Sequence, residues 1–237
     1  MAAARLIPAR FLFRPNRFII EADLENGRRV RCHLADPGRL AELLRPGAVL
    51  RLRPAPAGIR RRTSYSAVLV RAPDPPHAWV SLDTSLPNRL AATLLRQGRV
   101  GGIGRGWRVR PEVRHHHSRF DFELSRPGGR RLLVEVKSVT LVEAGTARFP
   151  DAPTARGARH LHELARFVAS GGEALLLFVV QRHDARRVRA NTATDPAFAA
   201  ALGEARRAGV RIRAVRYRLE ASGRAICMGA VPVRVAS

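Results

Sequence analysis

The chain has 237 residues, enough for one large domain or two modest domains, each with its own hydrophobic core. Hydrophobic residues make up 46% of the sequence, which excludes a disordered basic tail. The 43 Lys and Arg residues outnumber the 19 Asp and Glu residues, and the formal net charge is +24. A folded protein this basic is expected to bind a polyanion. Nucleic acid is favoured over an anionic membrane surface, because no amphipathic helix with aromatic anchors is evident.

The sequence shows no pattern typical of export. No apolar run is long enough to span a membrane, and Pro8 and Pro15 interrupt any transit-type helix near the N-terminus. Cys32 and Cys227 are far apart and belong to no paired motif, so neither a disulfide framework nor a zinc site is indicated. We therefore expect a cytoplasmic protein that does not associate with a membrane.

The first third of the chain reads as short strands separated by turns. Strands are expected over residues 17–25, 28–34, 49–53, 64–71 and 78–82, with a short helix over 39–44. Asn26-Gly27 supplies the tight turn of the first hairpin. Five short strands with one small helix predict an OB-like β-barrel, a fold that binds single-stranded nucleic acid on one face.

Two features of this barrel are candidates for contact with nucleic acid. The aromatic residues available for base stacking are Phe11, Phe13, Phe18, Tyr65 and Trp79. We expect most of them in the core. The run Arg60-Arg61-Arg62 is the better indication of contact with a phosphate backbone, although such runs are usually solvated loops.

A helix over residues 85–97 follows, so we place the domain boundary near Asp83, with one domain over 1–83 and the other over 84–237. Beyond it the pattern changes to α/β. Strands are expected over residues 119–124, 132–139, 174–181 and 211–216, helices over 154–170 and 195–208, and a final hairpin over 218–220 and 225–228. The predicted fold is mixed α+β and α/β, a β-barrel followed by an α/β domain.

A cluster of charged residues is predicted on one hairpin of the second domain. A Pro-Gly-Gly turn centres this hairpin near Gly128, which places Asp121 opposite Glu135. Opposed residues have Cβ atoms about 4.5–5.5 Å apart, and two carboxylates that close repel unless a cation lies between them. Lys137, the only lysine of the chain, lies two residues beyond Glu135 and so on the same face. Glu112, a short distance upstream, is a candidate third carboxylate.

Carboxylate oxygens in this arrangement suit Mg²⁺ or Mn²⁺. We expect Glu112, Asp121 and Glu135 to bind the metal, which would polarise a phosphate and generate hydroxide. Lys137 would orient the attacking water or stabilise the developing charge, so Asp121, Glu135 and Lys137 are the expected catalytic residues. The alternative is an ion-pair cluster on an exposed sheet face. The functional cluster is favoured because the second strand of the hairpin is apolar enough to be central and acids are scarce in this chain.

Asp…Glu-x-Lys across a hairpin flanked by helices is typical of the PD-(D/E)XK nuclease superfamily. Longer sequence segments narrow the resemblance to one family. In the second domain they are residues 118–122 (SRFDF), 134–141 (VEVKSVTL), 149–157 (FPDAPTARG) and 160–164 (HLHEL). The N-terminal half adds residues 17–18 (RF), 37–40 (PGRL) and 88–90 (NRL). The chain closely resembles the sugar fermentation stimulation protein A (SfsA) family over nearly its whole length. It departs at residues 35–38, Ala-Asp-Pro-Gly, where Asn-Thr-Gly is expected in many relatives.

This resemblance implies an OB-like N-terminal domain, a restriction-endonuclease-like C-terminal domain and binding of DNA without marked sequence preference. Members are also described as candidate regulators of sugar metabolism. The expected nucleic-acid contacts, including the arginine run, are Arg17, Arg39, Arg60, Arg61, Arg62, Asn88, Arg89, Arg156 and His160. Nuclease activity is suggested by the fold and not by the family's name.

Three functions stay open from the sequence: non-specific DNA binding, hydrolysis of DNA at the metal site, and sequence-specific regulation of transcription. The last is disfavoured because no helix-turn-helix with a basic recognition helix is evident. Two other motifs are given plain interpretations. The run His115-His116-His117 is not expected to bind a metal, because consecutive residues of a strand point to opposite faces. Glu163 is expected on the solvated face of its helix.

Overall fold

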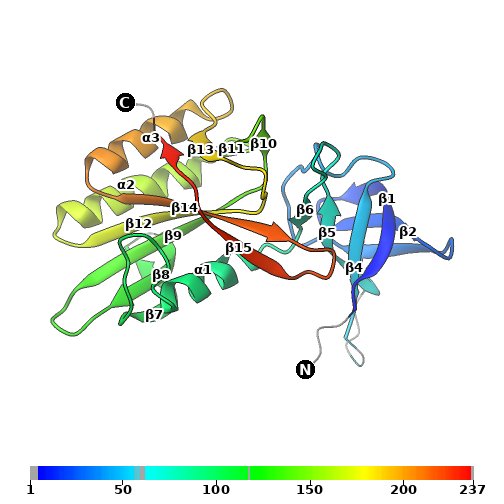
Figure 1. The fold of residues 1–237 in the computed structure, drawn as a ribbon, viewed down its shortest axis with the longest axis horizontal. Helices are drawn as coiled ribbons and strands as arrows, with labels where there is room; N and C mark the ends of the chain where they lie inside the picture. Colours follow the sequence, from blue (N-terminus) through cyan, green and yellow to red (C-terminus); the bar gives the residue numbers. More distant parts are fainter. Residues whose placement is uncertain (1–4, 57, 59–61, 117, 236–237) are drawn as a thin grey trace. The chain divides into compact units, whose positions relative to one another are not determined.

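The computed structural model describes residues 5–56, 58, 62–116 and 118–235. The chain forms two compact units, Met1–Leu86 with Arg218–Ile226, and Pro87–Tyr217 with Cys227–Ser237 (Figure 1). Each unit has a hydrophobic core of its own.

The first unit is built on a closed β-barrel. Its strands are β1 (Ile7–Asn16), β2 (Ile19–Leu24), β3 (Arg29–His33), β4 (Val49–Pro54), β5 (Tyr65–Arg71) and β6 (Trp79–Ser81). They are ordered β3-β2-β1-β4-β5-β6, and a parallel pairing of β3 with β5 closes the first five into the barrel. Alternation fills its interior: Ile20, Ala22 and Leu24 of β2 are buried, and so are Leu50 and Leu52 of β4.

β1 lies where the sequence predicted no strand. It contains both Pro8 and Pro15, which are unusual within a sheet because proline cannot donate to the ladder. Ala9 and Phe11 nevertheless point into the core, and the strand's pairing shifts register after Phe11. Because two prolines and a register shift interrupt β1, the sequence does not show its alternation of buried and exposed residues.

The short helix predicted over residues 39–44 is wrong. Leu43 and Leu44 donate hydrogen bonds to the carbonyl of Leu40, which has a φ of 50°, so this segment is only a turn. A proline-glycine pair stands on each side of it. Too few residues remain between them to extend a helical nucleus.

The second unit is organised around a six-stranded sheet in the order β15-β14-β12-β9-β8-β7. These strands are β7 (Arg108–His115), β8 (Ser118–Ser125), β9 (Arg131–Val139), β12 (Glu173–Val180), β14 (Arg211–Leu219) and β15 (Ala225–Ala230). β9 and β14 each run parallel to β12 on its two sides, and β7 and β8 continue the sheet in antiparallel pairs. The four strands predicted for this domain are confirmed as β8, β9, β12 and β14, and the final hairpin is confirmed as the end of β14 with β15.

In the described residues, the helices that accompany this sheet are α1 (Leu86–Arg96), α2 (Ala155–Ala169) and α3 (Pro196–Arg207). α2 and α3 lie together on one face, and α1 lies on the other (Figure 1). Leu161, Leu164 and Phe167 of α2 pack with Phe198 and Leu202 of α3 over the apolar strands. The three helices predicted for this part of the chain are thus confirmed, with each end shifted by one residue.

Five strands of this unit were not predicted. β7 carries Pro111 and a positive φ of 50° at Glu112, so its alternation is broken. The others form a small second sheet of β10 (Val142–Glu143), β11 (Thr146–Phe149), β13 (Arg187–Ala190) and β16 (Val233–Arg234). Strands of two to four residues are too short to show a period.

Candidate active site

The hairpin of β8 and β9 has the register that its turn predicted. Phe122 pairs with Val134, Glu123 with Leu133, Leu124 with Leu132 and Ser125 with Arg131. Each of these pairs is symmetric about residue 128. Beyond Phe122 the carboxylate of Asp121 accepts the backbone N–H of Val136 at 2.7 Å. Asp121 and Glu135 therefore lie next to each other, close enough for the charge of Glu135 to act on Asp121.

Glu135 is the centre of the cluster. It is 4% exposed, and its Oε1 accepts from Lys137 Nζ at 2.6 Å and from His160 Nδ1 at 2.6 Å. Its second oxygen, Oε2, is buried and has no hydrogen-bond partner within the described residues. A buried carboxylate oxygen left unpaired is costly unless a ligand satisfies it.

Two helices hold the carboxylates in place. Asn88 of α1 donates from Nδ2 to Asp121 Oδ1 at 2.7 Å. His160 of α2 is 2% exposed, and its Nε2 receives the Nε–H of Arg156 at 3.3 Å. Because an arginine Nε can only donate, His160 must carry its proton on Nδ1 and donate it to Glu135. Asn88 and His160, which were expected to contact nucleic acid, contact the acids of the site, and their contact with nucleic acid stays a prediction.

The pKa values of the two carboxylates, Asp121 and Glu135, are shifted in opposite directions. Burial, and after it the negative charge of Glu135, raise the pKa of Asp121 against the hydrogen bonds from Val136 and Asn88. Burial also acts on Glu135, but the hydrogen bond from His160 and the charge of Lys137 outweigh it and lower the pKa of Glu135. The site thus holds one well-compensated carboxylate beside a poorly compensated one.

Glu112 is not part of this cluster, which corrects its prediction as a third ligand. It lies in β7 with a φ of 50°, its side chain is 71% exposed, and its carboxylate is 3.7 Å from Arg119. A φ of 50° at Glu112 turns its side chain out of the strand's alternation, although the register of β7 and β8 is unbroken. Among the residues described, no group of three or more His, Cys, Asp or Glu side chains is arranged to hold a metal.

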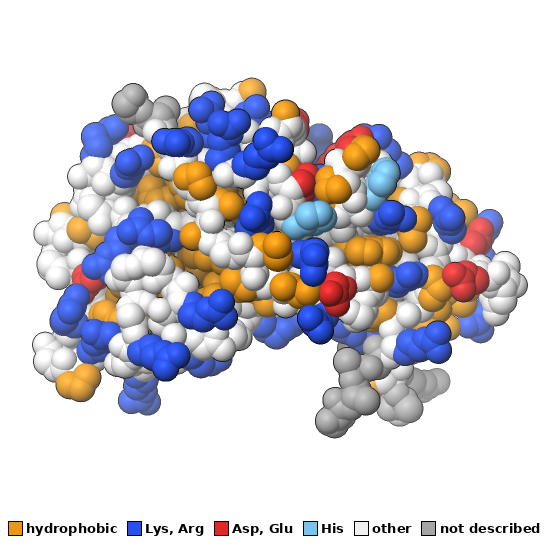
Figure 2. Space-filling view, viewed as in Figure 1, with side chains coloured by type: hydrophobic (Ala, Val, Ile, Leu, Met, Phe, Trp, Pro, Cys, Tyr) orange, Lys and Arg blue, Asp and Glu red, His pale blue; other side chains and the backbone are white. Residues whose placement is uncertain are grey.

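The remaining expected contacts lie on the surface or outside the described residues. Arg60 and Arg61 fall outside them. The exposed ones are Arg17, Arg39, Arg62, Arg89 and Arg156. Figure 2 shows Lys and Arg side chains spread over the face in view, with few acidic side chains among them. Such a surface suits contact with a polyanion.

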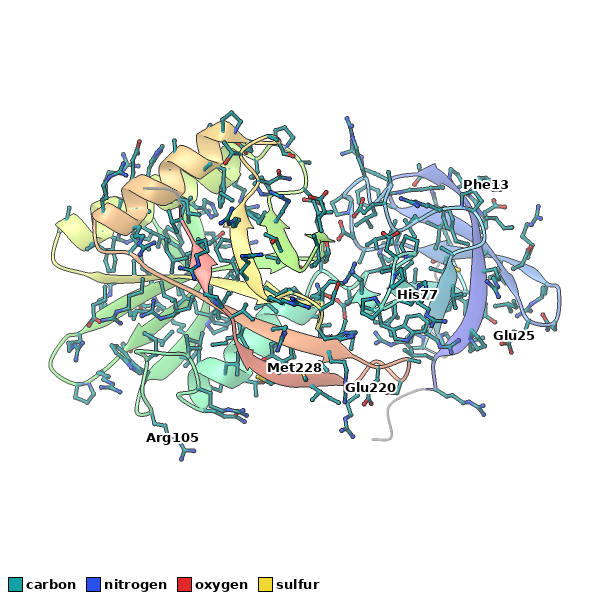
Figure 3. All side chains as sticks on the ribbon, turned by 45° about the horizontal axis from the view of Figure 1, so that its top comes forward. Phe13, Glu25, His77, Arg105, Glu220 and Met228 are labelled. Carbon is teal, nitrogen blue, oxygen red and sulfur yellow. The ribbon has the colours of Figure 1, made fainter. Side chains whose placement is uncertain are left out.

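The aromatic residues of the barrel divide as expected only in part. Phe11 is buried at 3% exposure, whereas Phe13 and Phe18 are each 48% exposed. Phe13 is labelled on the barrel in Figure 3. Trp79 lies under the guanidinium of Arg51 at 5.2 Å, which occupies one face of its ring.

Comparison with known proteins decides the family. Residues 12–82 match the model of the SfsA N-terminal OB domain, and residues 85–223 match that of the sugar fermentation stimulation protein RE domain. The chain belongs to the SfsA family. It is 48% identical to the sugar fermentation stimulation protein homolog of Moorella thermoacetica over 218 residues, 92% of each chain. It is 43% identical to that of Symbiobacterium thermophilum over 241 residues, covering 96% of this chain and 94% of the other.

A solved SfsA structure shows the same fold. The SfsA of Pyrococcus furiosus, solved in complex with Ca²⁺, superimposes with a TM-score of 0.86 at 29% identity, covering 99% of this chain and 100% of that one. The predicted architecture of an OB-like barrel followed by a restriction-endonuclease-like α/β domain is confirmed. The exact domain boundary after residue 83 stays a prediction. In the part of the chain that the structure describes, no helix is both long and apolar enough to cross a membrane.

Proposed function

We propose that this SfsA protein binds DNA without marked sequence specificity and hydrolyses its phosphodiester bonds. Asp121 and Glu135 would hold a divalent cation, and Lys137 would act beside it. One observation carries the proposal: Glu135 Oε2 is buried with no partner in the described part of the chain, next to a second carboxylate and the chain's only lysine. A nucleic-acid substrate is supported by the net charge of +24. A cytoplasmic location goes with this proposal and stays a prediction.

The residues present fit a divalent cation. Glu135 Oε2 and the Asp121 carboxylate are hard oxygen ligands, which Mg²⁺ and Mn²⁺ prefer. Two protein carboxylates suffice for Mg²⁺, because it usually keeps several waters and takes further ligands from substrate phosphates. The Ca²⁺ in the P. furiosus relative is consistent with a site of this chemistry. When bound, such an ion would polarise the phosphate and lower the pKa of a bound water.

The side chains divide the remaining work. His160 holds Glu135 Oε1, which leaves Oε2 available to a ligand. Asn88 fixes the carboxylate of Asp121 from α1. The Lys137 ammonium lies 2.6 Å from Glu135 Oε1, where it can orient the attacking water or stabilise negative charge on the phosphate. Lysine suits this position because it is a compact point charge on a flexible stem, whereas arginine is a planar fork.

DNA binding without cleavage is the second candidate. It is favoured by the ion pair of Lys137 with Glu135, which already engages one oxygen of the proposed ligand. In that case the cluster would only hold β9 to α2. Regulation of sugar metabolism, which the family's name suggests, would then rest on binding alone.

The deciding experiment measures cleavage of branched, nicked and single-stranded DNA by the purified full chain, with Mg²⁺, Mn²⁺ or a chelator. We expect metal-dependent cleavage that Glu135→Gln abolishes and that Lys137→Arg lowers about 100-fold or more. DNA binding measured in chelator should persist in both variants. Glu143→Gln, which changes an exposed acid paired with Arg148, is the matched control and should cleave normally.

Cleavage that survives in Glu135→Gln would contradict the assignment of the site. Binding by the wild type with no cleavage of any substrate would favour the second candidate.

A further inference from the structure

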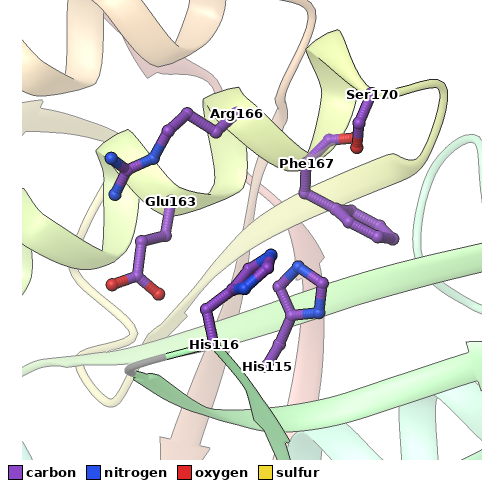
Figure 4. Close-up of a pocket in the computed structure, with 6 residues that line it drawn as sticks. All are labelled: His115, His116, Glu163, Arg166, Phe167 and Ser170. Carbon is purple, nitrogen blue, oxygen red and sulfur yellow. The ribbon is translucent and has the colours of Figure 1, made fainter.

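A second candidate binding site lies near the cluster of Asp121 and Glu135, between the end of β7 and α2. It is a pocket of about 340 Å³ (Figure 4). The residues that line it are His115, His116, Glu163, Arg166, Phe167 and Ser170. None of them takes part in the hydrolytic site proposed above.

Glu163 is the unusual member of this pocket. It was expected on a solvated face, but it is 5% exposed, and its Oε2 is buried with no hydrogen-bond partner among the described residues. Its carboxylate points from α2 toward the ring of His116 (Figure 4). An unpaired buried carboxylate oxygen is expensive for the folded state, so a ligand that donates an N–H would relieve a real cost.

Aromatic rings line another part of the pocket. The rings of His115 and Phe167 meet edge to face with centroids 5.0 Å apart, and His116 stands 4.4 Å from His115. Burial, and then the nearby charges of His116 and Arg131, lower the pKa of His115, which leaves its ring neutral near pH 7. Rings of this kind stack against planar ligands, and stacking is tolerant of which base is presented.

The pocket and the carboxylate cluster share one face of α2. His160, Glu163 and Phe167 are spaced i, i+3 and i+7, and with a rise of about 1.5 Å per residue Glu163 and Phe167 lie about 4.5 and 10.5 Å along the axis from His160. Phe120 bridges the two sites, with its ring 5.5 Å from that of His160 and 6.5 Å from that of His115. Successive nucleotides of a duplex strand rise about 3.4 Å, so the pocket lies about one to three nucleotides from the cluster.

We propose that this pocket receives one unstacked nucleobase of the bound DNA strand, close to the phosphodiester bond that is cut. Glu163 Oε2 accepts a hydrogen bond from an amino-bearing base, Phe167 and His115 pack against the base, and Arg166 at the rim faces the strand's phosphates. The inference rests on the proposed function, and it deepens it. The substrate class becomes DNA with an unpaired base, as at a mispair, a flap or a single-stranded end.

The test measures binding in chelator, so that it does not depend on cleavage. Short duplexes carrying one unpaired dC or one unpaired dT opposite an abasic site are compared with the fully paired duplex by fluorescence anisotropy, using the full chain. The wild type should bind the unpaired dC about tenfold more tightly than the unpaired dT, because cytosine presents an exocyclic amino group, whereas the N3–H of thymine is flanked by two carbonyl oxygens that repel the carboxylate. Both should bind more tightly than the paired duplex.

Two variants make the test specific. Glu163→Gln keeps the shape and removes a buried charge, so it should fold, and it should lose the preference for dC over dT. Phe167→Leu keeps the site apolar and should weaken both unpaired duplexes without changing their ratio. Glu204→Gln, an exposed acid of α3 beside His162, is the control and should behave as the wild type.

Equal affinity for paired and unpaired duplexes, or a dC preference that survives in Glu163→Gln, would overturn the pocket even if metal-dependent cleavage is observed. The converse result is distinguishable. A Glu163-dependent preference for unpaired dC, in a protein that cleaves nothing with Mg²⁺ or Mn²⁺, would support base binding in the pocket and contradict the proposed nuclease activity.

Discussion

Asp121 and Glu135 differ in what compensates their charge, and this difference is what makes the cluster suited to a cation. Glu135 has an ammonium and an imidazole N–H on one oxygen, whereas Asp121 has only an amide and a backbone N–H. Neutral donors compensate a buried carboxylate less than charged ones do. A divalent ion placed between the two would compensate both, and the metal-free protein should carry a measurable penalty at Asp121.

That penalty predicts opposite effects of two similar substitutions on the metal-free protein at pH 7. The pKa of Asp121 is raised, so the stability it contributes is present below its usual value of 3.8 and is lost as pH rises through the folded value. Asp121→Asn should therefore raise the melting temperature, with Asn88 able to turn its amide to face the new side chain. Each kcal/mol gained corresponds to about 2–4 °C.

Glu135→Gln should do the reverse. The pKa of Glu135 is lowered, so its contribution is present above its usual value of 4.5 and is lost as pH falls through the folded value. The substitution leaves Lys137 and His160 without their anion and should lower the melting temperature. Thermal melts in chelator measure both, with Glu143→Gln as the control. Adding Mg²⁺ or Mn²⁺ should stabilise the wild type but neither variant, and equal stabilisation of all three would contradict the metal assignment.

At the scale of elements, one side chain joins the starts of α2 and α3, the two helices on one face of the sheet. Asp195 is 6% exposed and caps α3 by accepting the N–H of Phe198 at 2.8 Å. Its other oxygen accepts the N–H of Thr154, the N-cap of α2, at 2.7 Å. At Gly157 an added Cβ would lie 2.7 Å from Thr154 and 3.1 Å from Phe198, so the helices approach closely here. This junction fixes α2, and α2 carries both His160 and Glu163.

Asp195→Ala should therefore destabilise the second unit by about 2–4 kcal/mol, because it removes a helix cap and leaves two N–H groups without an acceptor. Asp195→Asn keeps one acceptor oxygen but presents an NH₂ to the other N–H, so its effect should be intermediate. Urea denaturation followed by circular dichroism measures the order. Asp151→Ala, at an exposed loop position before α2, should change little. An Asp195→Asn variant as unstable as Asp195→Ala would argue against the double cap.

Many of the helices and strands could be predicted from the sequence, and the predictions that were wrong have local causes. The register of β8 and β9 followed from a turn centred on Gly128, because one symmetric turn fixes every opposed pair of a hairpin. Glu112 was misplaced because a single positive φ redirects its side chain, and one residue's backbone angle leaves no periodic signal in the sequence. β1 was missed because two prolines broke its pattern.

The roles of Asn88 and His160 could not be derived from spacing at all. Each lies on a helix distant in sequence from the carboxylate it contacts, 33 and 25 residues away. Which helix residue meets which strand residue is decided by how α1 and α2 pack on the sheet, and that is a property of tertiary structure. The only signal in the sequence was that both residues lie in segments that resemble the SfsA family. The burial of Glu163 was hidden in the same way, because helical periodicity indicates a face but not what covers it.

At the scale of the whole molecule, the excess of positive charge is distributed on guanidinium groups that do structural work as well. Arg14 is an example: it donates to the carbonyls of Arg17, Asp36, Gly38 and Arg39. Burial lowers the pKa of Arg14, and Asp36 partly offsets this. Arg14 thereby ties together the two loops that carry Arg17 and Arg39, both exposed and both expected to contact DNA. Arg17 and Arg39, whose backbone carbonyls Arg14 contacts, are therefore a specific pair of arginines at which to test the role of the positive charge.

The affinity for duplex DNA in chelator should fall linearly with salt on a double-logarithmic plot, because each neutralised phosphate releases condensed counterions. Replacing both Arg17 and Arg39 by Gln should lower the slope by about 0.9 for each phosphate that the protein no longer neutralises, equally for duplexes of different sequence. Arg29→Gln is the matched control, since Arg29 is exposed but already paired with Asp23 at 3.4 Å. An affinity independent of salt would exclude the polyanion interpretation of the +24 charge. A slope unchanged in the double variant would instead assign phosphate binding to other arginines, and a weakening confined to one DNA sequence would mean that these two side chains read bases.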